Sequence, residues 1–131
     1  MACEHILLID DDEDDRDFFV LAIQDFSPYL QCSYFNDAEK ALHALIAGAL
    51  KPEIIFLDLN MPMMTGMQCL TELKKIQRIN LIPVIIYSTS SDPRFMHESI
   101  KNGAHSYIIK PASIPELTEV LRQTFSRTIG I

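Results

Sequence analysis

The stretch "ILLIDDDEDDRDFF", residues 6–19, runs four apolar residues directly into six consecutive carboxylates. Short, continuous apolar runs are typical of strands that are buried on both faces of a parallel sheet. Acidic residues directly after such a strand have two explanations. They can begin a helix, where carboxylates satisfy free N–H groups and the positive end of the helix dipole, or they can gather around a hard cation.

The rest of the chain repeats this change from a strand pattern to a helix pattern. Continuous apolar runs like the first cover residues 54–57, 84–87 and 107–109, whereas residues 30–35 mix polar and apolar side chains and suit an edge strand. Between the runs, apolar residues recur every three or four positions. These helical patterns lie near residues 19–26, 38–46, 70–76, 92–102 and 117–125. Strict alternation of five strands and five helices predicts an α/β fold, a doubly wound parallel sheet with helices on both faces.

Composition and charge narrow the classes of function. The 131 residues suit one domain, residues 1–131, and the net charge of −7 argues against a nucleic-acid partner, because phosphates select basic surfaces. No segment has the length of a membrane span and no signal peptide opens the chain, so we expect no membrane partner. The three cysteines are widely spaced and fit neither a disulfide framework nor a zinc site, which predicts a reducing, cytoplasmic setting. Nothing in the sequence indicates an oligomeric state.

Polar side chains follow the predicted central strands at the point where each strand ends. Asp10 and Asp11 follow the first run, and Asp58, Ser88 and Lys110 follow the later ones. In an open parallel sheet, functional groups gather at the carboxyl ends of the strands, near the point where the strand order reverses. We therefore expect these five side chains to form one site. Several carboxylates at one sheet edge repel one another unless a cation lies among them, and oxygen ligands favour Mg²⁺ over Zn²⁺.

The segments "IDD", "LDLNMP", "IIYSTS" and "YIIKP" that carry these residues resemble the receiver domain of response regulators. The resemblance covers about residues 5–126 and includes "MPMMTG" after Asp58 and "GAHSYIIKP" before the last helix. It implies a flavodoxin-like fold with strand order 2-1-3-4-5 and a stand-alone receiver of two-component signal transduction, similar to chemotaxis regulators. It also implies how Mg²⁺ is bound: directly by Asp11, through water by Asp10, by a carboxylate oxygen of Asp58 and by the backbone carbonyl of Asn60.

The resemblance further implies a phosphoryl-transfer mechanism. Asp58 would accept a phosphoryl group from a sensor histidine kinase or a histidine phosphotransfer protein, while Lys110 and the metal offset the charge of the transition state. Ser88 would then bond the phosphoryl group, and Tyr107 would rotate into the space so opened. This switch would change the face formed by residues 92–126 and its binding to an unknown output protein. Such a chain is a phosphoacceptor that assists its own phosphorylation and dephosphorylation, not an enzyme.

Three residues that flank the site carry further expectations. Ser88 is followed by Thr89, where the family usually has a very small residue, and we expect this bulk to slow the loss of the phosphoryl group. Ser90 should lie beside the same site. The peptide bond between Lys110 and Pro111 is a candidate for the cis form, which would aim the ammonium at the site.

Simpler interpretations stand beside these roles. Residues 12–15 are best explained as the solvated start of a helix. Taken alone, Lys110 is more often a surface base before a turn, and Tyr107 a half-exposed sheet residue. A metal-dependent hydrolase would also use an acidic cluster, but no general base lies nearby in the sequence. The haloacid dehalogenase phosphatases have a second Asp two residues after the nucleophile, where this chain has Asn60. A receiver-like binding module that is never phosphorylated is the remaining alternative.

Overall fold

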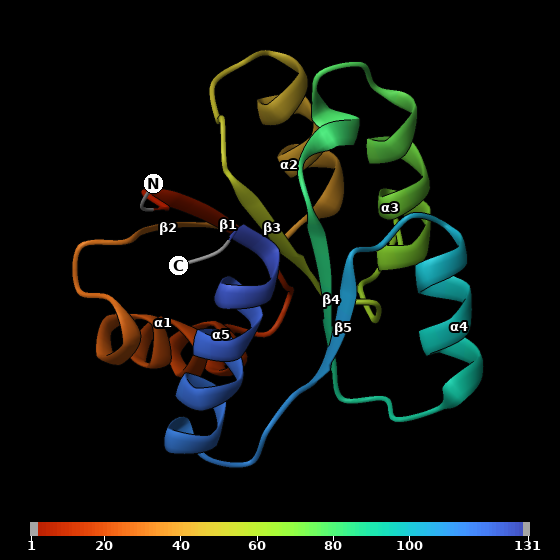
Figure 1. The fold of residues 1–131 in the computed structure, drawn as a ribbon. Coiled ribbons are helices and arrows are strands. Elements are labelled where there is room, and N and C mark those ends of the chain that lie inside the picture. The colour runs from red at the N-terminus through yellow and green to blue at the C-terminus, as the bar shows by residue number, and fades with distance from the viewer. Residues whose placement is uncertain (1–2, 130–131) are drawn as a thin grey trace.

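In the part of the chain that the structure describes, the sheet has five parallel strands in the order β2-β1-β3-β4-β5, as the resemblance implied. The structure is a computed structural model and describes residues 3–129 (Figure 1). The strands are β1 (His5–Ile9), β2 (Gln31–Phe35), β3 (Ile54–Leu57), β4 (Val84–Ser88) and β5 (Ser106–Ile109). The helices are α1 (Glu13–Phe26), α2 (Ala38–Ile46), α3 (Gly66–Lys75), α4 (Pro93–Lys101) and α5 (Ile114–Ile129). The predicted α/β, doubly wound fold is confirmed.

Helices cover both faces of the sheet, so that the protein has two apolar layers (Figure 1). Because side chains alternate along a strand, Leu7 and Ile9 of β1 pack toward α2 and α3, whereas Ile6 and Leu8 pack toward α1 and α5. Helices α1 and α5 lie side by side on their face, where Phe26 of α1 meets Phe125 of α5 edge to face. Both faces of the central strands are therefore buried, as their continuous apolar runs predicted.

Three features differ from the sequence interpretation. Residues 107–109 do not form a strand buried on both faces: β5 is an edge strand with only β4 beside it, and the Ile109 side chain is 44% exposed. A short 3₁₀ helix, Ile79–Leu81, precedes β4 and was not expected. Helix α5 also runs beyond residue 126, to Ile129. None of the helices in residues 3–129 is long and apolar enough to cross a membrane.

Candidate functional site

Three carboxylates meet at the carboxyl edge of the sheet, where β1 and β3 end. The backbone N–H of Asp10 donates to the carbonyl of Phe35, and that of Asp58 donates to the carbonyl of Ile9, each at 3.0 Å. Parallel pairing thus fixes both aspartates at the same level. Asp10 and Asp58 are buried and Asp11 is exposed, and one carboxylate oxygen from each lies within 4.8 Å of the others.

Burial makes the two inner carboxylates costly to ionise. It raises the pKa of Asp58 from 3.8 to about 7, with Lys110 opposing the rise and Asp10 adding to it. Burial also raises the pKa of Asp10, against the N–H of Asp12 and the ammonium of Lys110. A divalent cation would remove this cost, and three carboxylates form the hard oxygen donor set that Mg²⁺ takes. The residues present therefore fit a magnesium ion, and its affinity should rise as the pH rises through 7.

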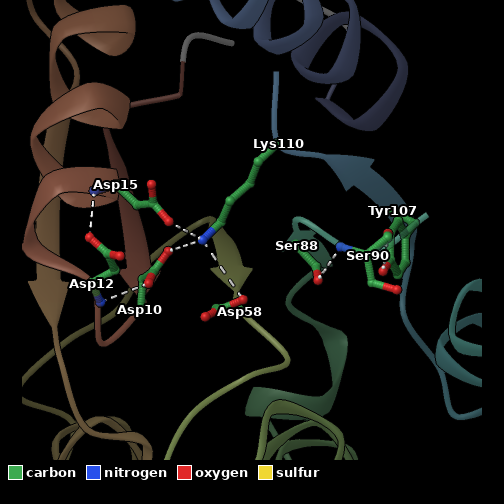
Figure 2. Close-up of polar contacts among 8 residues, drawn as sticks. All are labelled: Asp10, Asp12, Asp15, Asp58, Ser88, Ser90, Tyr107 and Lys110. Atoms are coloured by element: carbon green, nitrogen blue, oxygen red, sulfur yellow. Dashed lines mark hydrogen bonds and ion pairs between the residues drawn. The ribbon is translucent and has the colours of Figure 1, made fainter. Parts of the chain in front are cut away.

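Lys110 brings a buried ammonium to the same pocket from the end of β5. Its backbone N–H donates to the carbonyl of Ser88 at 2.7 Å, and its side chain is 8% exposed. The Nζ atom lies 2.9 Å from Asp10 Oδ2, 2.6 Å from Asp15 Oδ2 and 3.8 Å from Asp58 Oδ1 (Figure 2). Burial alone would lower the pKa of Lys110, but the hydrogen bonds to Asp15 and Asp10 outweigh it and raise the pKa. The ammonium is therefore firmly charged.

Asp15 is a member of the site that the sequence interpretation missed. The sequence pattern of residues 12–15 predicts the solvated start of a helix. This is correct for Asp12, whose side chain caps α1 by accepting from the backbone N–H of Asp15 at 3.1 Å. The side chain of Asp15, however, makes the shortest contact of Lys110. Helical side chains point back toward the N-terminus of their helix, and this end of α1 faces the sheet edge. The contact therefore depends on α1 having its cap at Asp12, three residues before Asp15.

The expected cis bond between Lys110 and Pro111 was wrong. No cis peptide bond occurs in the described residues 3–129, so this bond is trans. The ammonium reaches the carboxylates all the same, because the β4–β5 pairing already places the Lys110 backbone at the sheet edge.

Ser88, Ser90 and Tyr107 form a linked group on the other side of Asp58 in the view of Figure 2. Ser88 is fully buried, and its Oγ accepts from the backbone N–H of Ser90 at 3.1 Å. The hydroxyl of the half-buried Tyr107 donates to the carbonyl of Ser90 at 2.9 Å. Ser90 therefore connects the serine at the site to the tyrosine on β5. Thr89, which lies between Ser88 and Ser90 in the sequence, is exposed.

A cavity of about 420 Å³ opens beside Ser88, between the β3–α3 loop and α4. Asn60 and Ser90 contribute to its wall, together with the half-exposed ring of Phe95. The exposed Asn60 follows Asp58 by two residues, so the loop that carries both borders the pocket and the cavity. Ser88 is one of the residues that line this cavity, although it is not exposed to solvent.

Gly66, the first residue of α3, lies against the backbone of Asp58. A Cβ atom at this position would lie 2.0 Å from the Asp58 carbonyl oxygen and 2.6 Å from Leu59 Cα. We expect Gly66→Ala to lower the free energy of unfolding by about 3 kcal/mol or more, since the backbone on both sides must shift. Urea denaturation measures the loss. Gly48→Ala is the control: its φ of 76° strains the alanine, but nothing lies within 4 Å, so its loss should be only about 1–2 kcal/mol. Equal losses would contradict the steric argument.

The fold and the site define a flavodoxin-like α/β protein with an acidic pocket that also holds a buried lysine. Residues 6–122 match the family model of the response regulator receiver domain. The two-component response regulator ORR13 of rice (Oryza sativa subsp. japonica) is 29% identical, over 92% of this chain and 98% of the rice protein. The chain therefore belongs to the response regulator receiver domain family.

Solved structures agree with this assignment. The phosphorylated cyanobacterial phytochrome response regulator RcpA superimposes with a TM-score of 0.87 at 26% identity, covering 98% of this chain and 95% of RcpA. The Mn²⁺-bound form of response regulator Rcp1 has a TM-score of 0.84 at 22% identity, with 98% and 96% of the two chains covered, and shares the fold. Receiver domains of two-component systems take phosphoryl groups from histidine kinases or phosphotransfer proteins and bind Mg²⁺ at the acidic pocket.

Proposed function

We propose that Asp58 accepts the phosphoryl group in this chain, from a sensor histidine kinase or a histidine phosphotransfer protein in the cytoplasm. One observation carries the proposal: a buried carboxylate at the end of a central strand lies beside a second buried carboxylate and a buried ammonium. That arrangement can offset charge on a transferring group and keeps water from the carboxylate. The phosphorylated relative RcpA supports it.

Mg²⁺ is the cofactor of this proposal. Asp11 and Asp58 would hold it directly with their carboxylates and Asp10 through a water molecule, and the backbone carbonyl of Asn60 would complete the protein ligands. When bound, the ion neutralises negative charge on the phosphoryl oxygens. The Mn²⁺-bound form of Rcp1 supports a divalent ion in a protein of this fold.

Asp58 and Lys110 have separate roles in the proposed transfer. An Asp58 oxygen attacks phosphorus, the bond from phosphorus to the donor's histidine nitrogen breaks, and the imidazole leaves with the bonding electron pair. Lys110 donates hydrogen bonds to the phosphoryl oxygens while their charge grows. No general base is required, because Asp58 attacks as a carboxylate. A metal-dependent hydrolase would need such a base, and the family match does not favour that alternative or an unphosphorylated binding module.

The phosphorylated state would be transmitted through Ser88. Its hydroxyl uses a lone pair, not its proton, in the contact with Ser90, so the proton can be donated to a phosphoryl oxygen. A shift of Ser88 would disturb Ser90 and hence the hydroxyl of Tyr107. We propose that this chain of contacts changes the face of residues 92–126 for an output protein. Thr89 and Ser90 flank the path, and Thr89 slows the loss of the phosphoryl group by its bulk.

Intact-mass spectrometry tests the acceptor. After incubation with Mg²⁺ and acetyl phosphate, the wild type should gain one phosphoryl group, and it should gain none when Mg²⁺ is chelated. Asp58→Asn should gain none in either condition. Asp14→Asn, which removes an exposed carboxylate nearby, should behave as the wild type. A Mg²⁺-dependent adduct that forms on Asp58→Asn as fast as on the wild type would exclude Asp58 as the acceptor.

A further inference from the structure

We propose that Asp15 is a positioning residue for phosphoryl transfer: it holds the Lys110 ammonium away from the nucleophilic oxygen of Asp58 and toward the place of the incoming phosphoryl group. The proposal rests on the function proposed for Asp58 and Lys110. The resemblance to receiver domains assigns no role to Asp15, so the inference depends on the contacts in this structure alone.

The three carboxylates around Lys110 are not equivalent. Asp15 Oδ2 at 2.6 Å and Asp10 Oδ2 at 2.9 Å accept hydrogen bonds, whereas Asp58 Oδ1 at 3.8 Å lies beyond hydrogen-bond range. An ammonium group has three protons. Asp15 and Asp10 engage two of them and leave one for the side of the pocket that Asp58 occupies (Figure 2).

This gap has a chemical use. A direct hydrogen bond from Lys110 to Asp58 would occupy the carboxylate that must attack phosphorus, whereas the looser ion pair at 3.8 Å leaves its oxygens free. A phosphoryl group on Asp58, by contrast, would place its oxygens beyond the carboxylate, on the side of Asp58 that faces the Lys110 ammonium. Lys110 held by Asp15 is therefore placed for the phosphoryl oxygens and not for the free nucleophile. The centroid of the Tyr87 ring lies 5.1 Å from Nζ, so the ring restricts movement of the ammonium toward β4.

Asp15 is suited to this task by its place on α1. Its backbone N–H is fixed by the cap Asp12, so the carboxylate is carried by an ordered first turn. Within residues 3–129, the carboxylates that lie close enough together to hold a metal ion are those of Asp10, Asp11 and Asp58, and Asp15 is not one of them. An ion in that cluster would draw on Asp10, the other hydrogen-bond partner of Lys110. Asp15 would then remain the carboxylate reserved for the ammonium.

The test compares the wild type with Asp15→Asn, Asp15→Glu and Asp14→Asn. Asp14 is adjacent, exposed and equally charged, so its variant removes the same charge from the same helix end without touching Lys110. The rate of phosphorylation by acetyl phosphate is followed by intact mass at saturating Mg²⁺ and varied donor concentration. We expect Asp15→Asn to lower the saturating rate by roughly tenfold to a hundredfold, with little change in the half-saturating donor concentration. Asp15→Glu should recover part of the rate, and Asp14→Asn should keep all of it.

A second measurement needs neither Mg²⁺ nor donor. In metal-free protein labelled with ¹⁵N-lysine, the Lys110 ammonium should give an NMR signal protected from exchange, assigned by its loss in Lys110→Met. We expect this signal in the wild type and in Asp14→Asn, and its loss in Asp15→Asn.

Three results would overturn the proposal. An unchanged saturating rate in Asp15→Asn would show that Asp15 does not contribute to phosphoryl transfer. A faster rate would show that Asp15 competes with the phosphoryl group for the Lys110 ammonium. A Lys110 signal that persists in Asp15→Asn would show that Asp15 does not hold the ammonium. These results differ from a failure of the proposed function itself, in which the wild type gains no phosphoryl group at Asp58.

Discussion

Lys110→Met should lower the free energy of unfolding by about 3–5 kcal/mol at pH 8 without divalent ions, because it leaves buried carboxylates without their counter-charge. The Lys110 side chain is 8% exposed and lies 2.9 Å from the fully buried Asp10. Methionine keeps a flexible apolar stem of similar length, so the loss reports mainly the charge. Urea denaturation at several pH values measures it.

The pH dependence of this loss separates charge from packing. Without Lys110, Asp10 and Asp58 can relieve their repulsion by taking up protons, and burial already raises the pKa of both. The loss should therefore shrink as the pH falls from 8 to 5, and Mg²⁺ should recover part of it at pH 8. Lys75→Met is the control, since this lysine is 67% exposed and its ion pair within the described residues is with the exposed Glu72. It should change the stability by no more than about 1 kcal/mol. A loss for Lys110→Met that is equal at both pH values would indicate packing.

The alternation of apolar runs and helical periodicity predicted the strands and helices, but the apolar runs did not predict the position of each strand in the sheet. The run at residues 6–9 pairs with strands on both sides, and its four apolar side chains are all buried. The run at residues 107–109 has the same pattern, yet β5 lies at the edge. An apolar run reports buried or half-buried surface alike, so it cannot by itself separate a central strand from an edge that a helix partly covers. The strand order came from the resemblance, not from the pattern.

The site was predictable for residues that directly follow strands, and not for those on helices. Asp10, Asp58 and Lys110 had to meet, because parallel strands bring their carboxyl ends to one edge. Asp15 depends on where α1 begins, and a shift of one residue turns a side chain by about 100° around the helix axis. The Lys110–Pro111 bond was equally undetermined, since cis and trans forms before proline differ by only about 0.5–1 kcal/mol. The local sequence leaves that choice to the surrounding fold.

Asp58→Asn should make the metal-free protein more stable at pH 8 by about 2–4 kcal/mol, because it removes a carboxylate that the fold keeps ionised at a cost. The pKa of Asp58 is about 7 in the folded protein, against an ordinary value of 3.8. Between these values the folded state holds a proton that the unfolded chain has released. The contribution of Asp58 to the stability of the wild type must then fall as the pH rises from about 4 to about 7, and stay at the lower level above that.

The advantage of Asp58→Asn should therefore be absent below about pH 4 and full at pH 8, where thermal and urea unfolding can both measure it. Mg²⁺ should reverse the order at pH 8, since it binds the folded wild type with three carboxylates and the variant with only two. Asp14→Asn, at an exposed position, should show neither effect. A constant difference between Asp58→Asn and the wild type at all pH values would mean that the amide merely packs better. A difference that appears as the pH rises and changes sign with Mg²⁺ would locate the instability in the charge of Asp58, which the metal and the phosphoryl group use.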